Sequence, residues 1–488
     1  MRFSSLLLLF STIPDVFCGT TSFLGVPYAK PPLRELRFHD AVDSDIDKSK
    51  TYDKIRSVCS EYPYGSGSED CLYLNVFRGN SDKKKNTLLY FTNEELSEKK
   101  VAALVKDDLT MVYASIRTGV LGHLDGGSYG VSDVLTVVRF LKANSEELGV
   151  GPITAWASGD AAETLSAALP LLGDNVARVI LENGNQLTRT LERNKFERLS
   201  SHKFYRNLEC EIPSRDQTID CLRTKSLDQI VKAASDVHKA FYPFGEPFRA
   251  PSTEIKTTQV PTLLILYKDL PVGYSVDANF TAEFSYKDFK RFMASALPDS
   301  LHKNGPLLRR IFTPSTINKI LQDRDFSIPT YRLAQTLAEN KNQVYLMEFG
   351  INNPPKNCLQ DGAWEDIQPF CDKLLGYYTR FATKGAPTAQ GCDPKNPAWP
   401  ALKSSKRDYF VILKADGMLE WDFDFRRAAY ELWTNLLPSL DELELAGRRD
   451  AVFAEDEPTE ALLEEDDVQG WHVDAVASES HSPKKAEL

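Results

Sequence analysis

Short apolar runs alternate with helical patterns over the first two hundred residues. The runs are rich in β-branched and aromatic residues, and between them apolar residues recur every three or four positions, as on one face of a helix. The sequence therefore predicts helices over residues 131–148 and 161–172. It predicts buried strands over residues 71–77, 87–91, 109–114, 153–156 and 177–181.

The second half of the chain continues both patterns. Helical spacing occurs at residues 307–311 and 331–337, and strand-like runs occur at residues 344–349 and 409–413. An amphipathic helix is expected at residues 425–436. Strands that alternate with helices are typical of a mainly parallel sheet covered by helices, so the expected fold class is α/β.

The N-terminus has the pattern of a secretory signal. One positive charge at Arg2 precedes the short apolar run at residues 6–10, and small residues lie before a cleavage point near Cys18. We expect residues 1–18 to be a signal peptide, although a buried N-terminal strand is the alternative. No stretch approaches eighteen apolar residues, so no transmembrane anchor is expected.

The net charge of -11 lies almost wholly at the C-terminus. Residues 441–470 carry twelve acidic side chains against two arginines, which leaves residues 1–440 neutral. A neutral body offers no basic face for phosphates, so a nucleic-acid partner is not expected. We expect a folded domain over residues 19–443 and a solvated, acidic tail over residues 444–488.

The last four residues, Lys-Ala-Glu-Leu, are similar to the Lys-Asp-Glu-Leu retrieval signal of the endoplasmic reticulum. Such a signal is read by a receptor and requires an accessible C-terminus, which the acidic tail would supply. The expected location is the lumen of the endoplasmic reticulum, and secretion to the outside is the alternative.

Cysteine usage agrees with an oxidising compartment. Cys59 with Cys71, and Cys210 with Cys221, enclose short polar segments that indicate disulfide-closed loops. One of the last three cysteines is expected to lack a partner within the chain; these are Cys358, Cys371 and Cys392. No Cys-x-x-Cys motif supports a metal, so no metal site is expected.

Asn279 begins the only glycosylation sequon, Asn-Phe-Thr.

Several longer motifs carry a resemblance to a known family. They are FLGVPYAKPP at residues 23–32, SEDCLYLNVF at 68–77, RTGVLG at 117–122, GSYGVSD at 127–133 and YTRFATKG at 378–385. In this order they resemble the type B carboxylesterase/cholinesterase family. The resemblance implies an α/β-hydrolase fold, a central sheet with helices on both faces. It also implies that the two short cysteine pairs are the loop disulfides of the family.

A hydrolase of this fold needs a serine on a strand-to-helix elbow, Gly-x-Ser-x-Gly, because small neighbours let the backbone turn sharply. The corresponding segment here is ASGDA at residues 157–161, which puts Gly159 at the position of the nucleophile. Shifting the alignment by one residue would instead place Ser158 at the position of the nucleophile. Its neighbours two positions away would then be Trp156 and Asp160, a bulky ring and a charge, so Gly159 is the preferred assignment.

The oxyanion loop also departs from the family pattern. The His-Gly-Gly-Gly stretch corresponds to Thr92, Asn93, Glu94 and Glu95. Without glycines the backbone cannot easily present its N–H groups, and the two carboxylates would oppose a developing anion. This loop is not expected to stabilise an oxyanion.

The acid and the base of the catalytic triad are replaced as well. Leu270 occupies the position of the orienting acid, and the neighbouring Asp269 points elsewhere because it is one residue away. Trp364 occupies the position of the histidine, and no histidine lies between His302 and His472. The sequence therefore predicts a pseudoenzyme that needs no cofactor.

Three functions remain open. The first is binding of a protein or ligand, because the resemblance includes relatives without a nucleophile, such as neuroligins and part of thyroglobulin, that act in adhesion or dimerisation. The second is residual or unorthodox ester hydrolysis, and the third is transport of a hydrophobic ligand in the remaining gorge. The partner is unknown, and the predicted helix at residues 425–436 is a candidate interface of a homodimer.

Overall fold

The computed structural model describes most of the chain between residues 20 and 439. The described ranges are 20–60, 67–79, 83–105, 109–124, 126–188, 193–241, 248–249, 260–269, 317–351, 357–361, 367–389, 392–393, 396–402 and 408–439. Six sequence predictions lie outside the described residues. They concern the signal peptide at 1–18, the helix at 307–311, Leu270, Asn279, Trp364 and the tail at 444–488.

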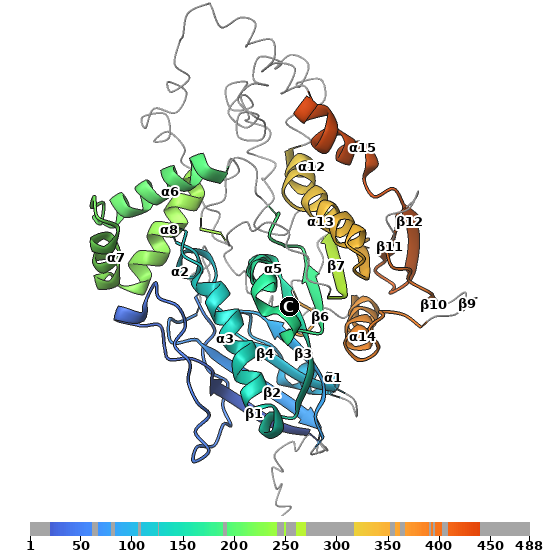
Figure 1. Cartoon of the computed structure of the whole chain (residues 1–488), viewed down its shortest axis with the longest axis horizontal. Coiled ribbons are helices and arrows are strands. Elements are labelled where there is room, and N and C mark those ends of the chain that lie inside the picture. The colour runs from blue at the N-terminus through green and yellow to red at the C-terminus, as the bar shows by residue number, and fades with distance from the viewer. Residues whose placement is uncertain are drawn as a thin grey trace, which may run out of the picture.

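A ten-stranded sheet forms the centre of the molecule (Figure 1). From one edge to the other its strands are β1 (Thr20–Pro27), β2 (Tyr73–Gly79), β4 (Leu109–Ala114), β3 (Lys85–Phe91), β5 (Val150–Ser158), β6 (Arg178–Glu182), β7 (Thr262–Tyr267), β8 (Val344–Phe349), β11 (Tyr409–Leu413) and β12 (Leu419–Phe423). Neighbours from β4 to β11 are parallel. The pairs β1–β2, β2–β4 and β11–β12 are antiparallel.

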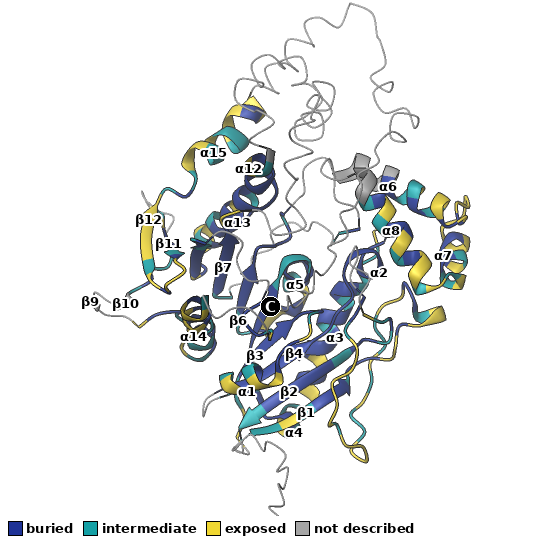
Figure 2. Ribbon diagram, turned by 180° about the vertical axis from the view of Figure 1, so that it is seen from behind, coloured by how far each residue is buried: buried dark blue, intermediate teal, exposed yellow. Residues whose placement is uncertain are grey.

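Alternate residues of the central strands enter two separate apolar cores, because successive side chains of a strand point to opposite faces. Ala155 and Ala157 of β5 belong to one core, whereas Trp156 belongs to the other. Helices α3 (Tyr129–Ala143), α5 (Gly159–Leu172) and α13 (Ile328–Glu339) cover the first face. Helices α1 (Glu98–Leu104) and α14 (Gln368–Lys384) cover the second. Figure 2 shows the strands between them as the most buried part of the molecule.

This arrangement is the α/β-hydrolase fold, as the sequence predicted. Three predicted strands, 109–114, 344–349 and 409–413, have the predicted bounds. The predicted helix at 131–148 is divided into α3 and α4 (Ser145–Leu148), because Asn144 leaves the helical conformation between them.

Several further elements were not predicted from the sequence. Helices α6 (Arg193–Asn207), α7 (Arg215–Thr224) and α8 (Leu227–Phe241) pack around a third, smaller apolar core beside the sheet (Figure 1). The remaining short elements are the 3-10 helices at Arg34–Leu36 and Gly173–Asn175, α2 (Gly119–Gly122), α12 (Ile317–Gln322), the π-helical turn at Asp323–Ser327, β9 (Cys392–Asp393) and β10 (Asn396–Pro397).

The predicted helix at residues 425–436 is irregular in the structure. It consists of α15 (Arg427–Glu431) followed by a π-helical turn at Leu432–Leu436. Trp433 packs partly buried against the first core, whereas Leu436 keeps 48% of its surface exposed. None of the helices in the described ranges is long and apolar enough to cross a membrane.

Three disulfides are present in the described residues. Cys59 is bonded to Cys71 and Cys210 to Cys221, the two pairs expected from the sequence. Cys358 is bonded to Cys371, a pairing that the sequence left open. This third disulfide joins the segment after β8 to the first turn of α14, so it closes a loop that contains the position of the expected catalytic histidine.

Candidate functional site at the carboxyl ends of the strands

The elbow lies where β5 passes directly into α5. Ser158 ends the strand with extended backbone angles, and Gly159 begins the helix with a φ of +55°. A side chain adopts this left-handed region only at a cost, whereas glycine adopts it freely. A Cβ built on Gly159 would meet no atom within 4 Å. The turn therefore has the sharp geometry of a nucleophile elbow, with open space where a side chain would begin.

A second glycine allows the elbow to pack against the next strand. Gly184 follows β6, and a Cβ at this position would come within 2.3 Å of the backbone oxygen of Gly159. No side chain can be accommodated at so short a distance. Gly184 thus permits the close approach that holds the strand-to-helix turn in place.

The Ser158 hydroxyl lies on the face of the sheet covered by α14, where it contacts a tyrosine. Its Oγ is 3.2 Å from the Tyr90 hydroxyl, and either atom can donate this hydrogen bond. Burial raises the pKa of Tyr90 well above its usual value, and the charges of Glu94 and Glu182 raise it further. A tyrosine with a raised pKa is a poor general base, so this contact does not activate Ser158.

The loop after β3, where the oxyanion loop is expected, has N–H groups that donate hydrogen bonds within the protein. The Thr92 N–H donates to the Ala114 carbonyl at 3.0 Å, and the Glu94 N–H donates to the Thr92 hydroxyl at 3.1 Å. Glu95 is exposed. Two backbone donors of the loop are therefore already occupied within the protein.

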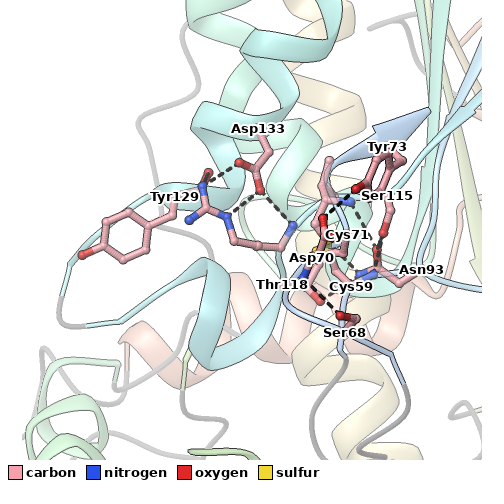
Figure 3. Close-up of a disulfide and its surroundings, with 12 residues drawn as sticks. Cys59, Ser68, Asp70, Cys71, Tyr73, Asn93, Ser115, Thr118, Tyr129 and Asp133 are labelled. Carbon is pink, nitrogen blue, oxygen red and sulfur yellow. Dashed lines mark hydrogen bonds and ion pairs between the residues drawn. A yellow bond between two sulfur atoms is a disulfide. The ribbon is translucent and has the colours of Figure 1, made fainter. Parts of the chain in front are cut away.

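The Asn93 side chain fastens this loop to the segment that follows β4 (Figure 3). Its Oδ1 accepts from the Ser115 hydroxyl at 2.6 Å and from the Ile116 N–H at 3.2 Å. Its Nδ2 donates to the Ile116 carbonyl at 2.9 Å. Ser115 Oγ also accepts from the Cys59 N–H at 2.7 Å, so the disulfide loop belongs to the same network. Asn93 thus has a structural role at a position where the sequence analysis expected an oxyanion-loop glycine.

The expected acid and base positions follow the next strands of the sheet. Leu270 lies three residues beyond the end of β7, and Trp364 lies between β8 and α14, both outside the described residues. Asp269 is described, and its side chain is exposed. Because β5, β7 and β8 belong to the parallel part of the sheet, their carboxyl ends lie at the same edge. Of the three expected triad positions, the structure describes only Gly159 at the elbow.

A buried glutamate that the sequence analysis did not single out lies at this edge. Glu182 ends β6, is 5% exposed, and accepts hydrogen bonds from three neutral donors. Trp156 Nε1 is 3.3 Å and the Tyr378 hydroxyl 3.0 Å from Glu182 Oε2, while the Tyr267 hydroxyl is 2.9 Å from Oε1. Burial raises the pKa of Glu182, and these three hydrogen bonds act in the opposite direction.

Aromatic rings surround this carboxylate and continue toward the altered oxyanion loop. The Tyr90 ring stacks on Trp156 with 3.7 Å between centroids, and Tyr378 meets Trp156 edge-on at 4.8 Å. Asn357 Nδ2 donates both to the Tyr90 hydroxyl at 3.0 Å and to Glu94 Oε2 at 2.9 Å. The two carboxylates and the rings form one polar and aromatic cluster under α14.

The cluster encloses a small cavity. Its walls include Tyr90, Trp156, Glu182, Phe349, Asn357 and Tyr378. Its space accommodates about one water-sized group. Among the described residues no group of three histidine, cysteine, aspartate or glutamate side chains is placed to hold a metal ion.

One sequence signal could have identified Glu182. Residues 178–182 read Arg-Val-Ile-Leu-Glu, and an acidic residue that directly follows three apolar residues of a strand and is itself buried is unusual. Its donors could not have been found in this way, because they come from β5, β7 and α14, which are distant in sequence.

Comparison with known proteins agrees with the fold. The model of the carboxylesterase family matches residues 14–433. The chain is 22% identical to carboxylesterase 5A of Canis lupus familiaris, over 87% of this chain and 86% of that protein. It is 22% identical to the pyrethroid hydrolase Ces2e of Rattus norvegicus, over 90% of each. It is 27% identical to thyroglobulin of Homo sapiens, over 46% of this chain but 9% of thyroglobulin.

The chain therefore belongs to the carboxylesterase family. The three disulfides and this membership indicate a lumenal or secreted protein.

Proposed function

We propose that this chain is a non-catalytic member of the carboxylesterase family that acts in the secretory pathway by binding a protein or a ligand. The observation that carries the proposal is Gly159, which has the left-handed φ of the elbow but no side chain to attack an ester. A hydrolase of this fold needs a nucleophile at that turn.

Three further observations support the proposal. The altered loop at residues 92–95 directs two N–H groups to Ala114 and Thr92 within the protein. Asp269, the nearest carboxylate to the expected acid, is exposed. The sequence has no histidine between His302 and His472, so none lies between β8 and α14, where the catalytic base is expected. Removing a whole triad costs about a millionfold in rate, which leaves little hydrolysis above background.

The proposed location is the lumen of the endoplasmic reticulum. The support is the Lys-Ala-Glu-Leu ending together with the disulfides. Glycosylation at Asn279 and a homodimer through residues 425–436 are part of the same proposal. The half-exposed side chain of Leu436 is available for such an interface.

The experiment is labelling of the native protein with a fluorophosphonate probe, next to measurement of aryl-ester turnover. We expect no label and no turnover above that of buffer. An active carboxylesterase under the same conditions shows that the probe works, and heat-denatured protein shows any unspecific labelling. Label that maps to a single serine of the native chain, Ser158 above all, would overturn the proposal in favour of an active hydrolase.

A further inference from the structure

The central sheet ends at a strand whose outer edge is open. β12 is the last of the ten strands, and among the strands that the structure describes it pairs with β11 alone. Four of its five residues are exposed, and Figure 2 shows it at the rim of the sheet. Natural proteins protect such edges with lysine, proline or a bulge, because unpaired backbone groups attract other chains. β12 has none of these three features between Leu419 and Phe423.

The pairing with β11 determines which backbone groups of β12 face outward. The Lys414 N–H donates to the Met418 carbonyl at 3.0 Å, so this pair of residues is a hydrogen-bonded one. Hydrogen-bonded and non-hydrogen-bonded pairs alternate along an antiparallel ladder. Leu419, Trp421 and Phe423 therefore belong to the non-hydrogen-bonded pairs and direct their backbone groups toward the open edge.

The two faces of β12 differ in their chemistry. Trp421 and Phe423 lie on one face and are 45% and 44% exposed, and the half-exposed Tyr409 of β11 lies opposite Phe423. Glu420 and Asp422 lie on the other face and are exposed as well. Asp422 Oδ1 accepts the Phe423 N–H at 2.8 Å. The open edge is therefore aromatic on one face and acidic on the other.

The acidic face selects the kind of chain that can pair with this edge. If two copies paired antiparallel through their outward residues, Glu420 or Asp422 would lie opposite an acidic residue of the other copy. Like charges directly opposite each other are destabilising, whereas opposite charges stabilise a pair of strands. Lys414 contacts Glu420 at 2.5 Å, but no ion pair joins Asp422 to a residue that the structure describes. A basic strand therefore fits this edge, and a second copy does not.

We propose that β12 is a docking edge for an extended segment of a partner protein in which basic and apolar residues alternate. The segment adds a strand antiparallel to β12, the more stable of the two orientations, and exchanges backbone hydrogen bonds with Trp421. Its apolar side chains pack on Trp421 and Phe423, and its basic side chains lie opposite Glu420 and Asp422. This inference rests on the proposed function in one respect, because it gives the binding of a protein a surface and a partner chemistry.

The test is titration of the full chain with the peptide acetyl-Thr-Val-Lys-Val-Lys-Val-Thr-amide, which carries a neutral fluorophore, followed by fluorescence anisotropy. We expect saturable binding below about 1 mM. The same peptide with glutamate in place of lysine should bind at least about fivefold more weakly, because two attractive pairs become repulsive. The affinity of the lysine peptide should fall as salt is added, since these charges are exposed.

Two methylated peptides test whether the backbone pairs. Methylation of the middle valine nitrogen removes the N–H that meets Trp421 and should weaken binding at least about tenfold. Methylation of a lysine nitrogen is the matched control, because its N–H points away from β12 in the proposed register. The control peptide should bind like the unmethylated one.

Variants of the chain connect the binding to this edge. Trp421→Pro removes the outward N–H and leaves the bonds to β11, because Trp421 is in a non-hydrogen-bonded pair. Trp421→Val loses the same ring and keeps the N–H, so Trp421→Pro should bind at least about tenfold more weakly than this control. Asp422→Asn should weaken binding about threefold, whereas Asp174→Asn, at an exposed position far along the chain, should not. The methylated peptides decide on the unaltered chain if Trp421→Pro fails to fold.

The inference is overturned if no saturable binding occurs up to about 1 mM, if the lysine and glutamate peptides bind equally, or if methylation of the middle valine has no effect. Sedimentation that shows a dimer of the unaltered chain, but only monomers of Trp421→Pro, would overturn it in favour of a second copy. Peptide binding by a chain that also hydrolyses esters would overturn the proposed function alone. Absence of peptide binding in a chain that hydrolyses nothing would overturn the inference alone.

Discussion

Replacing Gly159 by serine supplies the hydroxyl that the elbow lacks. The new Cβ would meet no atom within 4 Å, so no neighbour has to move. The φ of +55° is unfavourable for serine and costs about 1–3 kcal/mol of stability. Such a loss is tolerable for a domain of ordinary stability. We therefore expect Gly159→Ser to fold.

The same variant should hydrolyse no ester. A serine without a base remains a neutral hydroxyl, and loss of triad function in a serine hydrolase costs about a millionfold in rate. The loop at residues 92–95 keeps two of its N–H groups bonded within the protein, and each missing oxyanion donor costs about a hundred- to a thousandfold. Together these losses exceed what one hydroxyl group can restore.

The assay is the initial rate of hydrolysis of a simple aryl ester by Gly159→Ser, with Gly159→Ala as the matched control. Alanine has the same backbone strain and no hydroxyl, so the difference between the variants isolates the new group. Urea unfolding of both variants shows that each is folded. A faster rate in the serine variant that a fluorophosphonate abolishes would show that a base and an oxyanion site remain, which would refute this reasoning.

Three other predictions concern stability and location. Arg37 and Glu69 form a buried bidentate ion pair with both N–O distances at 2.6 Å. Glu69→Gln should therefore lower the free energy of unfolding in urea by about 3–5 kcal/mol, whereas Arg37→Met combined with Glu69→Leu should lower it clearly less. Equal losses in the two variants would contradict this account. Because the folded-state pKa of Glu182 is raised, its stabilising contribution is complete below the unfolded-state pKa and is lost as pH rises through the folded-state pKa. The melting temperature of Glu182→Gln minus that of the unaltered chain should therefore increase as pH rises from acidic values. A difference that stays constant with pH would disprove this prediction. Deleting residues 485–488 should move the protein from cell lysate to medium, and an intact chain that is secreted equally would exclude retention.

The sequence alone determined the fold class and much of the framework. Strands such as 344–349 and 409–413 were predictable because they are short, largely apolar runs whose residues are mostly buried. The family motifs gave the position of the elbow at Gly159 and the two short disulfide loops. These features depend on neighbouring residues, so a linear pattern is enough to find them.

Only the tertiary structure decided which distant groups meet. Cys358 bonds to Cys371 because the chain after β8 returns to the start of α14, which residue spacing did not reveal. Glu182 stands in the sequence only as an acidic residue at the end of a short strand, and it becomes the centre of an aromatic cluster because β5, β7 and α14 each direct one donor to it. The sequence specifies each side chain, but the environment that shifts the pKa of Glu182 is created by packing between elements far apart in the chain.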